Sequence, residues 1–378
     1  MSKHALLSAS SAYRWLACTP SARLSEPYQN GRASDAAEEG TVAHKLAELK
    51  LQDFFQAAYD EGEVKELKAV RKSSYYSQAM EDYVDEYTQV VMEAVTTSKA
   101  DLYTEVKVDF NKWVPDGFGT ADAVVITDSV LQIFDLKYGK GIPVQAAGNP
   151  QLRLYALGVY DTKSWLYDDI KEVTVNIVQP RNGGWSKETI PLKDLLAWGE
   201  SIKPIAKKAF KGEGETKAGE HCRFCPVAPR CRALKEYNTI DTSKAADLLT
   251  DVELAEVLGK ADSVIKYANL IKDYCLNEAL QGKHFAGWKL VEGRANRKYS
   301  DEAEIANVLQ EAGFENTDVF QPAKLLSITT MQSFLGKKKF EKLLGDYIVK
   351  PQGKPVLVPE SDPRPVFSSA ENDFEALD

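Results

Sequence analysis

The spacing of apolar residues divides the first third of the chain into helical and extended stretches. Residues 41–58 and 76–95 carry apolar side chains at helical intervals. The period changes at 102–110, where apolar and polar side chains alternate as in a half-buried strand, and 120–126 and 130–137 follow as two more strands with a short polar link. We therefore predict helices followed by a three-strand meander.

A helix, a strand and two further helical stretches follow this meander. Asn and Pro open a predicted helix at 149–160, and an apolar strand at 173–178 ends at "PRNGG". Helical stretches at 193–211 and 229–237 then bracket a cluster of cysteines. The order of elements predicts an α/β fold.

The pattern after residue 250 predicts a separate, mainly helical region. It comprises a long helix to about 281, a short strand in "FAGWKLVEG" (285–293) and helices near 301–312 and 329–344. The residues that follow are acidic and contain prolines, which predicts a disordered tail. The expected units are 1–240, 245–350 and 351–378.

The composition is that of a globular protein. The chain has 378 residues, 44% of them hydrophobic, and no apolar run approaches the roughly 20 residues that a membrane helix needs. The start carries no secretion signal, so we expect a cytoplasmic protein without a membrane partner. Five cysteines in that compartment are more typical of metal ligands, catalytic thiols or core residues than of disulfides.

The net charge of −9 argues against a protein that coats nucleic acid through bulk electrostatics. Locally, however, residues 203–235 hold nine Lys and Arg against three Glu. This excess fits either a solvated helix face or a surface that contacts phosphates.

An acid and a lysine stand close together at the end of the third predicted strand. Asp135 and Lys137 share one face of that strand because side chains alternate across a sheet, and Asp122 projects from the preceding strand. One interpretation is a simple Asp–Lys ion pair. The other is a Mg²⁺ or Mn²⁺ site, since two buried carboxylates need a neutralising cation.

Further polar residues occupy the neighbouring elements. His44 lies at the opening of the helix that precedes the meander, and Gln151 and Tyr155 share one face of the helix that follows it. Glu105 projects from the first strand, where it either marks the polar side or supplies an additional acid.

These residues form a series that resembles a known family. Gly40 to His44 gives G-x-x-x-H on a helix, and Gly119 to Asp122 gives G-x-x-D on a strand. The next strand carries D-x-K at 135–137, and the helix after it carries Q-x-x-x-Y at 151–155. Order and spacing resemble the RecB-like nucleases of the PD-(D/E)XK superfamily over roughly residues 1–235. The resemblance implies a restriction-endonuclease-like core, a central mixed sheet flanked by helices.

The same resemblance implies roles for the individual residues. His44, Asp122 and Asp135 would bind Mg²⁺ or Mn²⁺ with the Leu136 carbonyl, and Lys137 would be the catalytic lysine. The other implied residues are Glu105 as an additional acid, and Gln151 and Tyr155, which would contact the substrate and support the site.

Three cysteines form a C-x2-C-x5-C cluster typical of metal ligation. These are Cys222, Cys225 and Cys231, and the fourth ligand is either Cys18 or His221. Cys275 lies in an apolar helix and is interpreted as an inert core residue. Spacing alone leaves zinc and iron–sulphur open.

An N-terminal cysteine joined to a C-terminal triplet resembles the iron–sulphur branch of the same nucleases, the AddB-type and CRISPR-associated proteins. This implies that Cys18, Cys222, Cys225 and Cys231 hold a 4Fe–4S cluster as a structural clasp, with Zn²⁺ as the alternative.

The resulting expectation is a metal-dependent deoxyribonuclease. By analogy it is a phage-encoded exonuclease that processes DNA ends in recombination or replication for a single-strand annealing or binding protein. Two alternatives remain: a non-cleaving DNA-binding recombination or packaging accessory protein with a zinc site, and an interaction protein whose acidic tail recruits partners.

Overall fold

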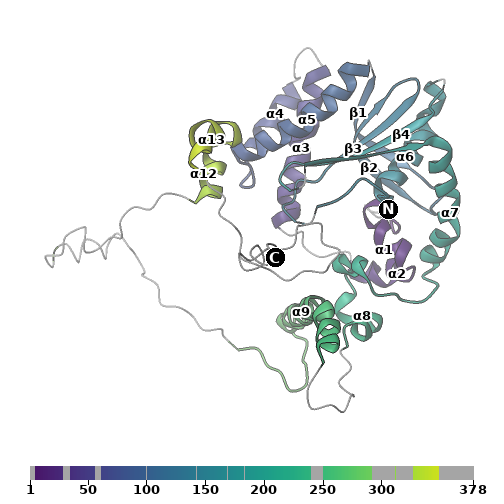
Figure 1. Ribbon diagram of the computed structural model, residues 1–378, viewed down its shortest axis with the longest axis vertical. Coiled ribbons are helices and arrows are strands. Elements are labelled where there is room, and N and C mark those ends of the chain that lie inside the picture. Colours follow the sequence, from purple (N-terminus) through teal and green to yellow (C-terminus); the bar gives the residue numbers. More distant parts are fainter. Residues whose placement is uncertain are drawn as a thin grey trace, which may run out of the picture.

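A five-stranded mixed sheet forms the centre of the molecule, with helices on both of its faces (Figure 1). The structure is a computed structural model. It describes residues 5–28, 35–55, 61–98, 100–141, 143–167, 169–182, 184–239, 250–291, 311 and 327–348.

The strands follow one another in chain order across the sheet. The first three form an antiparallel meander, the third and fourth are parallel, and the fourth and fifth are antiparallel. The strands are β1 (Asp101–Asp109), β2 (Phe118–Ile126), β3 (Val130–Leu136), β4 (Glu172–Gln179) and β5 (Gly184–Pro191). The predicted meander and fourth strand are confirmed.

The fifth strand, β5, was not predicted from the sequence. It lies at the edge of the sheet, and Ile190 is its one buried side chain. An edge strand with mainly solvated side chains shows no continuous apolar pattern, which is why "GWSKETI" was not interpreted as a strand.

Two hydrophobic cores lie on opposite faces of the sheet. On one face α3 (Asp35–Phe55) and α5 (Gln78–Ser98) pack against β2 and β3 through side chains such as Val84 and Phe134. On the other face α6 (Pro150–Lys163) and α7 (Leu192–Lys211) pack against residues such as Ile133. The predicted α/β class is therefore confirmed.

Further helices, most of them short, complete the described chain. Those before the sheet are η1 (Ala9–Ser11), α1 (Ala12–Ala17), α2 (Ser21–Ser25), η2 (Glu26–Tyr28) and α4 (Glu61–Arg71), and η3 (Ser164–Leu166) follows α6. Those after α7 are η4 (Glu220–Phe224), η5 (Ala228–Arg230), α8 (Arg232–Tyr237), α9 (Asp251–Leu280), α12 (Ile328–Leu335), α13 (Lys337–Leu344) and η6 (Gly345–Tyr347).

The start of α6 is fixed by its sequence. The Asn149 side chain accepts hydrogen bonds from the backbone amides of Gln151 and Leu152, and Pro150 occupies the first helical position. This cap sets where the first turn of α6 begins and hence the direction in which Gln151 points.

The C-terminal region differs in part from its prediction. The long helix is present as α9, but residues 285–291 form no strand, so that part of the prediction is wrong. The helix predicted at 329–344 is divided into α12 and α13 at Gly336, whose φ is 78°. The helix predicted near 301–312, apart from residue 311, and the tail 351–378 lie outside the described residues.

The α12–α13 pair packs against α5 (Figure 1). The Lys338 amide donates to Asp82 Oδ2 at 3.2 Å, and Phe340 is buried. A Cβ on Gly336 would lie 2.6 Å from Gln78 Cγ, so glycine also permits this close approach.

Within the described part of the chain, no helix is both long enough and apolar enough to cross a membrane.

A buried carboxylate joins three elements on the α5 side of the sheet. Glu81 lies 2.6 Å from Lys50 Nζ and 2.9 Å from Arg71 Nη2, and it accepts a hydrogen bond from the Tyr76 hydroxyl. Burial raises the pKa of Glu81, but these partners outweigh it and hold the pKa at about 2.

We expect Glu81→Gln to lower the free energy of unfolding at pH 7 by about 2–3 kcal/mol, because it removes the carboxylate that pairs with Arg71 and one of the two that pair with Lys50. The folded-state pKa lies below the usual value, so this stabilisation is present above about pH 4.5 and is lost as pH falls towards 2. Urea unfolding at pH 7 and pH 2.5 measures it. Exposed Glu93→Gln on the same helix is the control, and an equal loss at both pH values contradicts the assignment.

Candidate metal centre

Three elements bring His44, Glu105 and Asp122 to one point. They come from α3, β1 and β2, and one ligand atom of each lies within 4.8 Å of the other two. His44 Nδ1 is 3.3 Å from Asp122 Oδ2, which also accepts the Leu136 amide at 2.8 Å. Among the described residues this is the one group of three His, Cys, Asp or Glu side chains that meets this criterion.

The backbone is strained at Glu105. Its φ is 47°, in the left-handed region that a glutamate rarely adopts. The β1–β2 register pairs Thr104 with Ala123 and Val106 with Ala121, so Glu105 lies opposite Asp122. Strain of this kind persists where the surrounding structure imposes it, and it is concentrated at functional sites.

A second polar group lies beside the first. Asp135, near the end of β3, is 2.8 Å from Lys137 Nζ. The Gln151 amide on α6 joins this pair, because its Nε2 donates to Asp135 Oδ1 at 3.1 Å and its Oε1 accepts from Lys137 at 3.2 Å. Beyond the ion pair, Asp135 Oδ2 has no hydrogen-bond partner among the described residues. Gln151 therefore orients both charged side chains.

Packing explains one glycine of the sequence motifs and leaves the other unexplained. A Cβ on Gly119 would lie 2.8 Å from the Tyr155 ring, so only glycine allows β2 to approach α6 this closely. Tyr155 in turn lies 3.3 Å from Gln151 Nε2. Gly40 has open space where its Cβ would be, and nothing in the structure explains it.

The proximity of these charges shifts the pKa values of the histidine and its partner. Burial lowers the pKa of His44, but the Asp122 carboxylate outweighs burial and raises it to about 9. Burial likewise opposes ionisation of Asp122, yet His44 and Lys137 bring its pKa below the usual value. The two side chains thus form an ion pair at neutral pH.

The other two carboxyl groups are harder to ionise. Burial, followed by the charge of Asp122, raises the pKa of Glu105 to about 7. Burial also raises the pKa of Asp135, with Lys137 opposing this shift and Asp122 adding to it. Burial lowers the pKa of Lys137, but Asp135 outweighs it and the net shift is upward. Lys137 is therefore a cation at neutral pH.

The donor set fits a divalent cation. Mg²⁺ and Mn²⁺ prefer carboxylate oxygens, and imidazole is a common ligand of first-row metals. The charge of Asp122 opposes the ionisation of both Glu105 and Asp135, and a divalent ion would reduce this repulsion. About a third of the His44 side chain and 29% of the Lys137 side chain are exposed, so solvent reaches the site from their side.

The structure assembles most of the site that the sequence indicated, with a different grouping. His44 and Asp122 are together, but the third member of their group is Glu105, whereas Asp135 is paired with Lys137. Gln151 contacts Asp135 and Tyr155 contacts Gln151, while their predicted contact with substrate stays a prediction. The contact recorded for Leu136 is its amide, and the ligand role of its carbonyl stays a prediction.

The sequence did not indicate Tyr87. This α5 residue is 1% exposed, and its hydroxyl has no hydrogen-bond partner among the described residues. Burial and the nearby charges of Asp122, Asp135 and Glu105 raise its pKa well above the usual value, so it stays a neutral hydroxyl. Its position on an amphipathic helix is that of a core residue, and no signal in the sequence distinguishes it.

The four cysteines line one cavity, together with His221. Cys18 directly follows α1, and its sulfur accepts a hydrogen bond from the Lys217 amide at 3.4 Å. Cys222 lies in η4. Successive backbone turns lead from Cys222 to Cys225 and onward to Cys231. No three of these sulfurs lie within 4.8 Å of one another, and His221 Nε2 lies 2.9 Å from the Lys217 carbonyl.

The model of one protein family matches residues 4–365, and its description is "Protein of unknown function (DUF2800)". The chain belongs to this family. It is also similar to a solved structure titled "Crystal structure of SSO0001", with 15% identity and a TM-score of 0.25 over 57% of this chain and 95% of that chain.

Divalent metal binding is expected to become tighter as pH rises from 6 to 9. A metal ion competes with the protons on Glu105 and His44, whose pKa values are about 7 and 9, so binding releases protons. Calorimetric titration with Mn²⁺ in two buffers of different ionisation enthalpy counts these protons. His44→Gln should abolish the proton release above pH 7. Asp169→Asn, which removes a carboxylate from an exposed ion pair, is the control. An affinity independent of pH over this range contradicts the site.

Proposed function

We propose that the protein is a metal-dependent deoxyribonuclease. The observation that carries this proposal is the meeting of His44, Glu105 and Asp122 beside the buried Asp135–Lys137 pair. The order of these residues along the chain resembles that of the RecB-like nucleases, which supports DNA as the substrate.

The protein side chains hold and orient the reacting groups. His44, Glu105 and Asp122 would bind a Mg²⁺ or Mn²⁺ ion, with Asp135 as a further ligand. Such an ion supplies Lewis-acid stabilisation of the phosphate and lowers the pKa of a bound water. Gln151 fixes the orientation of Asp135 through its amide.

Lys137 is suited to stabilise charge. Because Asp135 keeps it protonated, its ammonium group is positioned to stabilise negative charge that develops on the phosphate. A general-base role would require the pKa of Lys137 to fall towards neutrality, which is opposite to the shift that its neighbours impose.

Several exposed basic side chains are available for further contacts to DNA. Lys207, Lys208 and Lys211 are exposed on the C-terminal half of α7, and Arg223 and Arg232 are exposed in and after the cysteine loop. Such side chains provide sequence-independent contacts to phosphates. The narrower proposal of an exonuclease that works with a single-strand annealing protein rests on the family resemblance alone.

The wild-type chain should cleave linear DNA in the presence of Mg²⁺ or Mn²⁺. Asp135→Asn and Lys137→Met should each lower the rate by about 10²-fold or more, because each removes a charge from the reacting centre. Electrophoresis of end-labelled duplex and single-stranded DNA measures the products.

The matched controls are Asp169→Asn and Lys171→Met. These two residues form the same D-x-K tripeptide with a 2.6 Å ion pair, but both side chains are largely exposed. Their variants should retain full activity. A wild-type chain that binds DNA and gives no products with either metal contradicts the nuclease and supports the non-cleaving accessory protein.

We also propose that Cys18, Cys222, Cys225 and Cys231 hold a 4Fe–4S cluster that clasps the N-terminal helices to the segment after α7. One observation supports it: all four cysteines line one cavity, although Cys18 lies far from the other three in the sequence. The choice of a cluster over a single zinc rests on the family resemblance.

Anaerobically purified protein should be brown, with an absorbance band at about 400 nm, and should contain about four iron atoms and four sulfide ions per chain. Cys225→Ser should lower thermal stability and bleach the colour, because the clasp couples cluster binding to folding. Cys275→Ser, outside the group, is the matched control. Colourless protein with one zinc per chain contradicts the cluster.

A further inference from the structure

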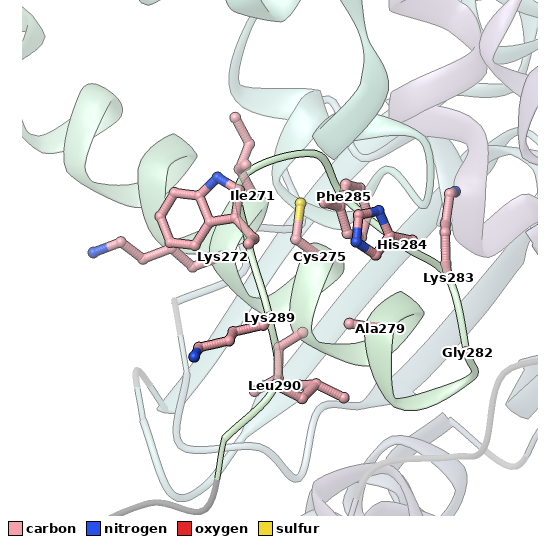
Figure 2. A pocket seen from close by; sticks show the side chains of 12 residues that line it. Ile271, Lys272, Cys275, Ala279, Gly282, Lys283, His284, Phe285, Lys289 and Leu290 are labelled. Atoms are coloured by element: carbon pink, nitrogen blue, oxygen red, sulfur yellow. The ribbon is translucent and has the colours of Figure 1, made fainter.

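The C-terminal end of α9 and the segment after it enclose an apolar cavity of about 600 Å³ (Figure 2). Gly282, with a φ of 92°, ends the helix and turns the chain back, so that residues 283–290 lie along it. A turn from Phe285 to Trp288, with Gly287 at a φ of 79°, keeps this segment against the cavity.

Apolar side chains dominate the lining. Ile271 and Leu276 come from the helix, and Phe285, Trp288 and Leu290 from the returning segment. Trp288 is 80% exposed and Leu276 is 51% exposed, a large apolar surface to leave in water. Cys275 also lines this cavity and is half-buried, so its interpretation as a core residue is wrong: the returning segment covers this face of α9 only in part.

The rim of the cavity is cationic. Lys283 is engaged, since it lies 2.6 Å from Glu278 and over the Tyr274 and Phe285 rings. Lys272 and Lys289 form no ion pair with any described residue, and Figure 2 shows both ammonium groups pointing to the same side. A ligand that fits must therefore combine apolar groups with negative charge on one side.

We propose that this cavity binds the acidic tail of this chain, residues 366–378. The segment "ENDFEALD" places Phe374 and Leu377 three residues apart, a spacing that puts both on one face of a helical turn. Glu371, Asp373, Glu375 and Asp378 surround them, and no basic residue follows Arg364. The apolar pair matches the lining, and the carboxylates match Lys272 and Lys289.

The length of chain before the tail permits this docking. The residues between Ile348, the last one described, and Glu371 can span roughly 75 Å when extended. A chain of this size has a radius of gyration of only about 21 Å when compact. Single-stranded DNA fits the cavity less well, because only two of the lysines are free to meet phosphates, the third being neutralised by Glu278, and four of the lining side chains are aliphatic and offer no ring for a base to stack on.

The emission of Trp288 tests the proposal in the full-length chain. The difference between each chain and its Trp288→Phe counterpart isolates this residue from the other tryptophans. Phe374→Ser with Leu377→Ser should release the tail and shift the Trp288 emission to the red. Adding a synthetic peptide of residues 366–378 to this variant should restore the emission in a saturable manner.

The double substitution Lys272→Glu with Lys289→Glu should lower the affinity for the peptide by at least about tenfold, because it reverses the charge that complements the tail. Lys266→Glu, an exposed lysine on the same helix outside the cavity, is the control and should bind as before. The proposal is overturned if the Trp288 emission changes neither with the tail substitutions nor on addition of the peptide. It is also overturned by a signal that oligothymidylate produces and the peptide does not displace.

Discussion

The repulsion between three closely placed carboxylates, of which Asp135 is buried and the other two are partly exposed, is the constraint on which the rest of the site depends. Asp122 and Asp135 project from neighbouring strands, and Glu105 lies opposite Asp122 on a third. Without bound metal, protonated His44 and Lys137 provide the compensating positive charge. A protein that builds such a centre without using it would bear a cost in stability, since replacing buried charges by apolar side chains is often neutral or stabilising.

The scaffold can hold these charges because each comes from a rigid element. His44 is on α3, packed on one face of the sheet, whereas Gln151 is on α6 on the other face. The sheet carries the carboxylates between them. The site thus depends on both hydrophobic cores, and the Glu81 ion-pair group that fixes α4 to α3 and α5 supports it from a distance.

Much of this arrangement was predictable from the sequence, because alternation places Asp122 and Asp135 on strands and a four-residue spacing places Gln151 and Tyr155 together. Glu105 was indicated as a possible additional acid, but its grouping with His44 and Asp122 was not, since it requires a backbone conformation that glutamate rarely adopts. Tyr87 and β5 were missed for a related reason: tertiary packing, rather than local pattern, determines their roles. The three cysteines of the C-x2-C-x5-C cluster share one cavity with both candidates for a fourth ligand, Cys18 and His221.

The most direct test is the location of a Mn²⁺ ion in crystals of the protein by anomalous diffraction. We expect a peak bound by His44 and Asp122, with Glu105 or Asp135 completing the protein ligands. A map from crystals soaked in Mn²⁺ with no peak there, while His44 and Asp122 keep their present contact, would contradict it.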